Sequence, residues 1–411
     1  MPDPSGRGPH ARRFGERPVT GMSTVSIPAG APPRDRVELA GVIGLLVFVG
    51  ALQLSIAVAG IVLAFSIGCW ALFATLHHES VGVPRFFWPL LVYAALTLLS
   101  AAASYDSAAS FVDSKQLVLF LIVPMVYQFG RGARAMTVVQ VVITVGAASA
   151  AWGIVQYGLF NYNNLGQRPQ GALGHYMTYS GLLLLVVGAA VARLLFEPRN
   201  RAWPAMILPA LLVALVLTFT RSAWVGACAV AALLLGMKDF RLLPVIPIVA
   251  AAFFAISPPQ ITARFYSIFD LKDPTSRDRV AMLHEGVAMV RAHPITGVGP
   301  NMVQRLYAQY RDPTAVEKVN PHLHNVPMHI AAERGLPALA AWLCVIGIAT
   351  IDLARLLRRS RFPSLPATAL AAIAGMLAAG LFEYNFGDSE FLMLFLVLVT
   401  LPFAAERPDL P

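Results

Sequence analysis

Residues 176–196, with the sequence YMTYSGLLLLVVGAAVARLLF, decide the fold class. Arg193 is the one charged residue among them, and about 17 to 25 apolar residues are what an α-helix needs to cross a bilayer. The rest of the 411-residue chain has the same character: 57% of its residues are hydrophobic, 13% are charged and the mean hydropathy is +0.65. A soluble domain cannot bury this much apolar surface. The sequence therefore predicts an all-α polytopic membrane protein.

Apolar segments of this kind recur along the whole chain. At about 17 to 25 residues for each span, the sequence predicts about 12 transmembrane helices. The segments at 222–237 and 242–256 are short, and little polar sequence separates the first two segments. The expected spans are residues 38–54, 56–76, 86–103, 111–129, 136–157, 176–196, 203–220, 222–237, 242–256, 336–354, 367–384 and 390–405.

The spans divide the chain into three regions. Residues 1–36 contain six arginines among prolines and glycines without an apolar stretch, so we expect a disordered cytoplasmic tail and not a signal peptide. Residues 37–405 form the expected membrane domain, which includes a long outer loop at 257–334. Residues 406–411 form a second cytoplasmic tail.

The basic residues alternate between loops as expected for a membrane protein with a cytoplasmic N-terminus. The short loops assigned to the outside, with their flanks, hold only Lys115, Arg168 and Arg221. The net charge of +9 is therefore mainly a signal of topology, with membrane lipid as the partner and no reason to expect nucleic acid. The loops assigned to the cytoplasm hold Arg85, Arg131, Arg134, Arg193, Arg199, Arg201, Lys238, Arg241, Arg355, Arg358, Arg359 and Arg361.

The long outer loop at 257–334 is expected to be helical. Thr275 and Asp278 have the spacing of a capping box, and an apolar stripe follows until His293-Pro294. A second amphipathic stretch follows the turn at 297–300. We expect the two helices to lie on the membrane surface above a cavity. Their stripes are Val280, Leu283, Val287 and Val290 in the first helix and Met302, Leu306, Tyr307 and Tyr310 in the second.

A histidine-rich loop, Asn320-Pro321-His322-Leu323-His324-Asn325, ends this outer region. An imidazole exchanges a proton near neutral pH, which makes His324 a candidate base, although a lone loop histidine is more often without function. A metal site is a second interpretation, because His322 and His324 with His329 and Glu333 offer four ligands. It is the weaker one, since no cysteine or aspartate joins them.

Four groups of residues carry a family resemblance. In their order along the chain they resemble the bacterial O-antigen ligase and O-antigen polymerase superfamily, over about residues 38–405. One departure concerns the subfamily: the family often has a second glycine three residues after the position of Gly335, and here Ala338 stands there. The groups are Thr218–Trp224, Asp278-Arg279 with His293–Gly299, His322–Asn325 and Ala332–Gly335.

The resemblance implies an enzyme that transfers a glycan from an undecaprenyl-diphosphate carrier to a hydroxyl acceptor. The reaction would take place at the periplasmic face of the bacterial inner membrane. In the ligases the acceptor is the lipid A-core of lipopolysaccharide, in the polymerases it is another carrier-linked glycan, and exopolysaccharide assembly is equally open. The implied fold is the glycosyltransferase type C class, which works without a nucleotide sugar or cofactor and, in the ligases, without a metal.

Residue roles follow from the diphosphate leaving group. Guanidinium groups hold phosphate oxygens in pairs and stay charged, which makes Arg221 and Arg279 the candidates for diphosphate binding. An arginine at a span end is otherwise a snorkelling anchor. His324 is the expected catalytic base. Possible substrate contacts are Arg168, His175, His322, Asn325, Glu383 and Asp388, of which the last two are at least as suited to capping the last outer turn.

A transporter or lipid flippase is the weaker alternative. Such proteins usually place ionisable or helix-breaking groups near the middle of the bilayer. The expected span interiors hold mainly neutral polar residues such as Gln53, Gln140 and Gln156, while charges gather at the outer boundary. This distribution favours chemistry at the membrane face.

Overall fold

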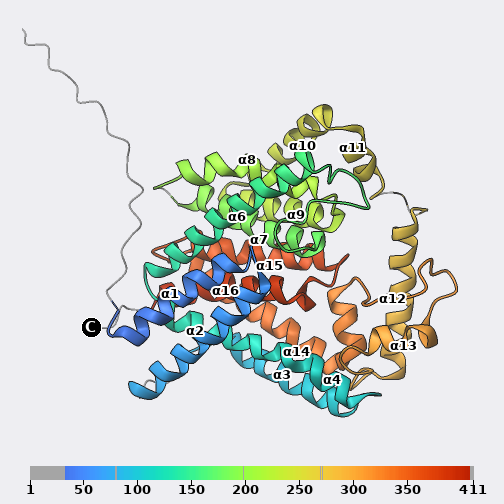
Figure 1. Cartoon of the computed structure of the whole chain (residues 1–411), viewed down its shortest axis with the longest axis horizontal. Helices are drawn as coiled ribbons and strands as arrows, with labels where there is room; N and C mark the ends of the chain where they lie inside the picture. Colours follow the sequence, from blue (N-terminus) through green and yellow to red (C-terminus); the bar gives the residue numbers. More distant parts are fainter. Residues whose placement is uncertain (1–32, 79–80, 198, 269, 271, 408–411) are drawn as a thin grey trace, which may run out of the picture.

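The computed structural model describes residues 33–78, 81–197, 199–268, 270 and 272–407, so most of the two expected tails lies outside the described residues. The described chain is helical throughout, without a β-strand (Figure 1). Its elements are α1 (Arg36–Ala51), α2 (Ile56–Leu76), α3 (Phe87–Ala102), α4 (Ser107–Asp113), η1 (Ser114–Leu121), α5 (Ile122–Phe129), α6 (Arg134–Leu159), α7 (Tyr176–Phe196), α8 (Ala202–Leu217), α9 (Arg221–Lys238), η2 (Phe240–Leu242), α10 (Val245–Ile256), α11 (Pro259–Tyr266), α12 (Pro274–Ala292), α13 (Met302–Tyr310), α14 (Val326–Leu357), α15 (Ser364–Gly380), η3 (Asn385–Gly387) and α16 (Ser389–Ala405).

Each of the twelve apolar segments coincides with a helix or a run of helices. By length and composition, six of the described helical stretches are able to cross a membrane, which confirms the all-helical membrane class. The number of twelve spans stays a prediction. The six stretches are Ile56–Leu76, Ser107–Phe129, Arg134–Leu159, Tyr176–Phe196, Arg221–Lys238 and Val326–Leu357.

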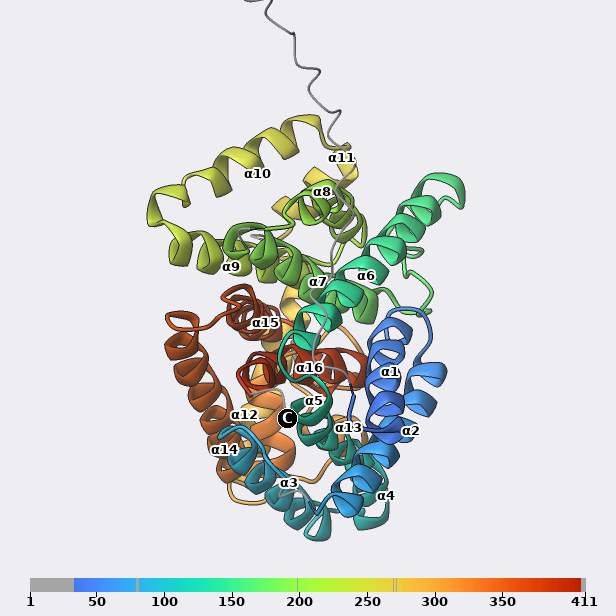
Figure 2. The same cartoon turned by 90° about the vertical axis from the view of Figure 1, so that its left-hand side faces the viewer.

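Three helices, α7, α15 and α16, form the centre of the bundle, between α14 on one side and α1 and α2 on the other (Figure 2). They are buried along most of their length. A helix that is apolar on every side packs best in an interior. Helices α2 and α3 instead leave large apolar side chains such as Ile61, Trp88 and Leu99 exposed, as expected for contact with lipid.

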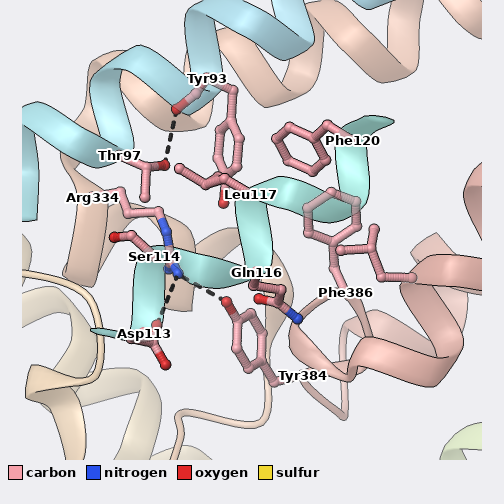
Figure 3. Close-up of a pocket in the computed structure, with 11 residues that line it drawn as sticks. Tyr93, Thr97, Asp113, Ser114, Gln116, Leu117, Phe120, Arg334, Tyr384 and Phe386 are labelled. Atoms are coloured by element: carbon pink, nitrogen blue, oxygen red, sulfur yellow. Dashed lines mark hydrogen bonds and ion pairs between the residues drawn. The ribbon is translucent and has the colours of Figure 1, made fainter. Parts of the chain in front are cut away.

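The segment predicted as one span at 111–129 is not one α-helix. It runs from α4 into the 3₁₀-helix η1 and then into α5. Pro124 explains the break, because its ring lacks an N–H and collides with the turn before it, whereas the first turn of a new helix tolerates it. Just before η1, the Asp113 carboxylate lies 3.8 Å from the buried Arg334, which also donates to the Tyr384 hydroxyl at 3.3 Å (Figure 3).

Helix α14 begins at Val326, ten residues before the predicted span start at 336. Asn325 caps it by accepting a hydrogen bond from the Met328 amide at 2.9 Å. The helix is kinked at Gly335, whose φ of +82° favours glycine. A Cβ at Gly335 would lie 2.0 Å from the Ile295 carbonyl oxygen.

The Gly297–Pro300 turn packs directly against this kink. The Val298 and Gly299 amides donate to the Ala332 and Glu333 carbonyls, each at 2.9 Å. A Cβ at Gly297 would lie 2.2 Å from the Glu333 carbonyl carbon. The turn therefore satisfies the backbone groups that the kink frees.

The predicted helices of the outer loop exist as α12 and α13, with α11 as an unpredicted addition. The predicted capping box is wrong: Asp273, not Thr275, accepts the Ser276 amide at 3.2 Å and caps α12. The predicted apolar stripe is not the face that packs into the protein, because Val280 and Leu283 are exposed. The buried face of α12 instead consists of Asp278, Ala281, Met282, Glu285, Gly286 and Met289.

Two carboxylates on that buried face replace apolar contacts. Asp278 accepts the amides of Val316 and Glu317 at 3.0 and 3.1 Å, and Glu285 accepts the Asp312 amide at 3.0 Å. A loop that packs against a helix has backbone N–H groups without partners in regular secondary structure, so these groups need such acceptors. These bonds fix the chain between α13 and the histidine-rich loop.

Candidate active site

A cavity of about 190 Å³ lies between the start of α9, the middle of α12 and the loops that follow α13 and α15. Most of its wall is apolar, from residues such as Val280 and Leu283. Arg221, Arg279 and His324, which are far apart in the sequence, all reach it. An apolar cavity with a few convergent polar groups is the usual form of a ligand site. Two side chains of the predicted apolar stripe of α12, Val280 and Leu283, thus line this cavity.

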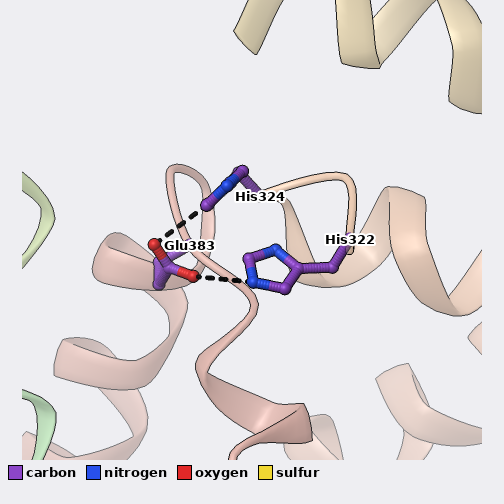
Figure 4. A group of neighbouring side chains, drawn as sticks. All are labelled: His322, His324 and Glu383. Carbon is purple, nitrogen blue, oxygen red and sulfur yellow. Dashed lines mark hydrogen bonds and ion pairs between the residues drawn. The ribbon is translucent and has the colours of Figure 1, made fainter. Parts of the chain in front are cut away.

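The His324 imidazole is paired with Glu383, in the loop between α15 and α16. Its Nδ1 lies 3.0 Å from one carboxylate oxygen, and the other oxygen lies 3.6 Å from Nε2 of His322 (Figure 4). The two imidazole rings meet edge to face, with centroids 4.1 Å apart. His324 has a φ of +47°, a conformation that a short polar turn tolerates. One carboxylate therefore faces two imidazoles.

The environment keeps Glu383 ionised. Burial alone would raise its pKa, but the hydrogen bond from His324 and the electrostatic influence of the His324 and His322 imidazoles lower the pKa to about 2. Burial lowers the pKa of His322 to about 4, with repulsion from His324 added and Glu383 opposing. An ionised carboxylate can only accept, so the proton of His324 sits on Nδ1. Its Nε2 is left with a lone pair.

The loop that carries His324 is tied to the loop that carries Glu383. The Asn325 side chain accepts from Met328 as the cap of α14, and its amide nitrogen donates to the Leu381 carbonyl at 3.1 Å. Asn325, predicted as a substrate contact, lines the cavity and also holds this junction.

Arg221 is the first residue of α9 and its side chain is 5% exposed, which does not fit a snorkelling anchor. Its Nη1 donates to the carbonyl and hydroxyl of Ser267 at 2.8 and 3.1 Å, and its Nη2 lies 3.3 Å from Asp273. A guanidinium has five N–H donors. These contacts leave Nε and one Nη2 proton for a ligand, as far as the described residues show.

Arg279, one turn into α12, also reaches the cavity. Within the described part of the chain its buried Nε has no hydrogen-bond partner. Burial lowers its pKa, the Glu383 carboxylate acts against this, and Arg221 lowers it further.

Arg264 of α11 adds a third guanidinium to this region. Its pKa is lowered to about 10 by burial first and then by repulsion from Arg221 and Arg168. Such crowding of like charges favours an anionic ligand.

The remaining predicted contacts are less central. Arg168 lies over the Tyr176 ring at 4.2 Å and donates to the Leu165 carbonyl at 3.0 Å, outside the cavity wall. Burial lowers its pKa, and Arg221 adds to the effect. His175 is exposed and stacks on Tyr176. The structure does not bring His175 to the cavity.

Asp388 serves a structural purpose. Its carboxylate accepts the Phe391 amide at 2.9 Å as the cap of α16 and the Thr178 hydroxyl at 2.5 Å. Of the two interpretations for Asp388, capping is the one that the contacts support, whereas Glu383 joins the histidines.

The four-residue metal set that was the weaker interpretation of the sequence is not assembled. His329 and Glu333 pair with each other at 3.2 Å, inside α14. A different trio, His322, His324 and Glu383, brings its ligand atoms within 4.8 Å of one another. Its donor set of two imidazoles and one carboxylate is one that zinc accepts in other proteins.

Two features of the site were not expected from the sequence. One is the pairing of His324 with Glu383, which no local spacing reveals. The other is the buried pair of Glu333 and Arg334, with the partly exposed Asp113 beside Arg334. Asp113 carried a signal, since a carboxylate inside an apolar segment usually has a function or a partner.

Residues 205–343 match the sequence model described as O-antigen ligase. The matched range runs from α8 into α14 and contains Arg221, Arg279 and His324, whereas Glu383 lies beyond it. No curated protein matches the chain. The match confirms the resemblance that the sequence motifs indicated.

Proposed function

We propose that the protein transfers a lipid-linked glycan to a hydroxyl acceptor, because residues 205–343 match the sequence model described as O-antigen ligase. The donor in this proposal is a glycan on undecaprenyl diphosphate. The acceptor is the lipid A-core of lipopolysaccharide, and the reaction takes place at the periplasmic face of the bacterial inner membrane. The polymerase reaction, with a second carrier-linked glycan as acceptor, is the alternative within the same superfamily.

The observation that carries the proposal is the His324 and Glu383 pair at the wall of a cavity that two arginines share. A sugar hydroxyl is a poor nucleophile at neutral pH, and a positioned base typically contributes about 10² to 10⁴-fold. With Nδ1 bound to Glu383, the Nε2 of His324 is the base. Glu383 then stabilises the imidazolium that forms, as a buried carboxylate does in related dyads.

The reaction balances without a cofactor. The acceptor oxygen forms a bond to the anomeric carbon of the donor while its proton passes to Nε2 of His324. The bond between that carbon and the diphosphate oxygen breaks, and the diphosphate keeps the electron pair. Arg221 and Arg279 stabilise the charge that gathers on the phosphate oxygens. We propose that no metal ion is needed.

The membrane arrangement belongs to the same proposal. It has cytoplasmic tails at residues 1–36 and 406–411, a membrane domain at 37–405 and the loop at 257–334 outside. Loop residues on α12 and the histidine-rich loop then share one face with the start of α9. The polar groups of the cavity gather at the end of a predicted span and in the loop at 257–334 and not in the middle of the predicted spans, which supports an enzyme over a transporter.

Deletion of the protein in its native host tests the function. The surface glycans of the deletion strain are separated on gels, with wild-type and His324→Ala copies returned on a plasmid. Loss of all long chains from lipopolysaccharide while carrier-linked polymer accumulates means a ligase, and a single capped repeat means a polymerase. Carrier-linked glycan that accumulates only inside the cell means a transporter and would overturn the proposal.

A further inference from the structure

His329 lies at the centre of the buried contacts behind the candidate active site. Its side chain, on the first turn of α14, is 3% exposed. Its Nε2 lies 3.2 Å from a carboxylate oxygen of Glu333, and its Nδ1 lies 3.3 Å from the backbone nitrogen of Leu323. Its ring also packs on the ring of Tyr384, with centroids 3.8 Å apart. Three segments of the chain therefore meet on one imidazole.

These contacts fix where the proton of His329 sits. The Leu323 N–H can only donate, so Nδ1 must accept. The ring proton is therefore on Nε2, where it is donated to Glu333. Glu333 also accepts from Arg334 at 2.8 Å, so the carboxylate that anchors His329 is itself held. With both nitrogens engaged, the ring acts as a spacer and not as a carrier of protons.

The two partners of the ring are chain neighbours of the reacting pair. Leu323 directly precedes His324, and Tyr384 directly follows Glu383. The Tyr384 amide donates to the second Glu383 oxygen at 3.1 Å. One ring thus sets the separation between two loops that lie 59 residues apart in the sequence.

We propose that His329 is a positioning residue that holds His324 and Glu383 in register. The inference rests on the proposed function of His324 as the base. His329 is not among the residues that line the cavity, so its effect passes through Leu323 and Tyr384. The same arrangement gives the Glu333-Arg334 motif a role. Arg334 binds Glu333 at 2.8 Å and the Tyr384 hydroxyl at 3.3 Å, and both of these residues contact the ring of His329.

Three substitutions of His329 distinguish the contribution of Nδ1 from that of Nε2. His329→Asn places an amide oxygen near the position of Nδ1, where it can still accept from Leu323. His329→Gln places an amide nitrogen near the position of Nε2, where it reaches only Glu333. His329→Ala removes both contacts.

The measurement is the turnover of glycan transfer by purified, folded protein. A displacement of about 1 Å at a reacting group costs on the order of 10²-fold. We expect kcat to fall by about 10- to 100-fold in His329→Ala and His329→Gln, with the KM for the carrier-linked donor unchanged because both arginines remain. His329→Asn keeps the contact with Leu323 but loses the ring that packs on Tyr384, so its kcat should lie between those of His329→Gln and wild type.

The matched control is His284→Ala on α12, which removes an exposed histidine that pairs with Asp312. It should leave both constants unchanged. Equal kcat values for His329→Asn and His329→Gln, or a wild-type kcat in both, would overturn the inference. If His329→Ala does not fold, the comparison of the other two decides alone. A wild-type protein without transfer would instead reject the proposed function.

Discussion

The Nδ1 atom of His324 lies 3.0 Å from Oε2 of Glu383, across 59 residues of sequence. Because the neighbouring imidazoles lower the pKa of this carboxylate to about 2 despite its burial, it acts as an acceptor at any physiological pH. Nε2 is then the one ring nitrogen of His324 that can take a proton. The pair thus selects the tautomer that a general base requires.

Glu383→Gln tests this pairing. Glutamine keeps an acceptor beside Nδ1 but lacks the charge that stabilises the imidazolium, so we expect kcat to fall by about 10²-fold or more while donor binding stays the same. Initial rates with excess acceptor measure this. Glu390→Gln, at the start of α16, is the control and should have little effect. A Glu383→Gln enzyme within a fewfold of wild type would remove Glu383 from the reaction.

Sequence reasoning identified the helices and four of the side chains at the cavity. Apolar runs of sufficient length have few alternatives to helix, so every expected segment is helical. Arg221, Arg279, His324 and Asn325 were predicted from motifs and their chemistry. The buried face of α12 was not predicted, because it includes Asp278 and Glu285, which accept hydrogen bonds from loop amides. The periodicity of apolar residues does not reveal such contacts.

Local sequence patterns also did not predict Glu383 as the partner of His324. Glu383 and Asp388 border the same loop, five residues apart, and both are acidic. Only the packing of α15 beside the start of α14 makes one of them the partner of His324 and leaves the other as the cap of α16. The sequence held the residues of the site but not their pairing.

His322 should make the folded protein sensitive to acid. Its pKa is about 4 in the folded protein against an ordinary 6.5. Between these values the unfolded chain binds a proton that the folded chain does not, so the free energy of unfolding decreases as the pH falls from 6.5 to 4. The difference corresponds to on the order of 3 kcal/mol. Glu383 adds a second loss at lower pH, between its ordinary 4.5 and about 2.

Thermal unfolding in detergent between about pH 7 and 4.5 measures this effect. The midpoint of wild type should drop steadily over that range, and the drop should be smaller in His322→Gln, which has no proton to take up. Parallel curves for the two proteins would contradict the assignment.

Arg279 should matter for the donor and not for the fold. Its Nε has no partner in the described part of the chain, and it lies among other guanidinium groups. We expect Arg279→Gln to lose most transfer and to raise the donor KM, while the unfolding midpoint stays equal or rises. Arg279→Lys should also lose most of the rate, because an ammonium is a point donor.

The control for this variant is Arg277→Gln, an exposed arginine two residues earlier on α12. It should leave transfer unchanged.

Arg221 should differ from Arg279, because its bonds to Ser267 and Asp273 join α9 to the start of α12. We therefore expect Arg221→Gln to lower both the transfer rate and the unfolding midpoint. Near-normal transfer by Arg279→Lys would contradict bidentate phosphate binding by Arg279.

Reporter fusions test the proposed membrane arrangement. Fusions after Arg134, Arg201 and Arg361 should report the cytoplasm, because basic residues gather in those loops. Fusions near Arg168 and Asp312 should report the periplasm. A cytoplasmic signal at Asp312 would place α12 and the cavity on the wrong side for a carrier-linked donor.

His324→Ala is the most direct test of the base. It should abolish detectable transfer and still leave a folded protein that binds carrier-linked glycan, because Arg221 and Arg279 remain in the cavity. His322→Ala should be milder, since the Nε2 of His322 is 3.6 Å from Glu383 and supports the pair only from the side. In a metal mechanism built on His322, His324 and Glu383, by contrast, all three would be needed equally. Transfer is therefore measured with purified protein in EDTA. Activity that EDTA removes and added metal restores, or a His324→Ala enzyme within a fewfold of wild type, would end the base assignment.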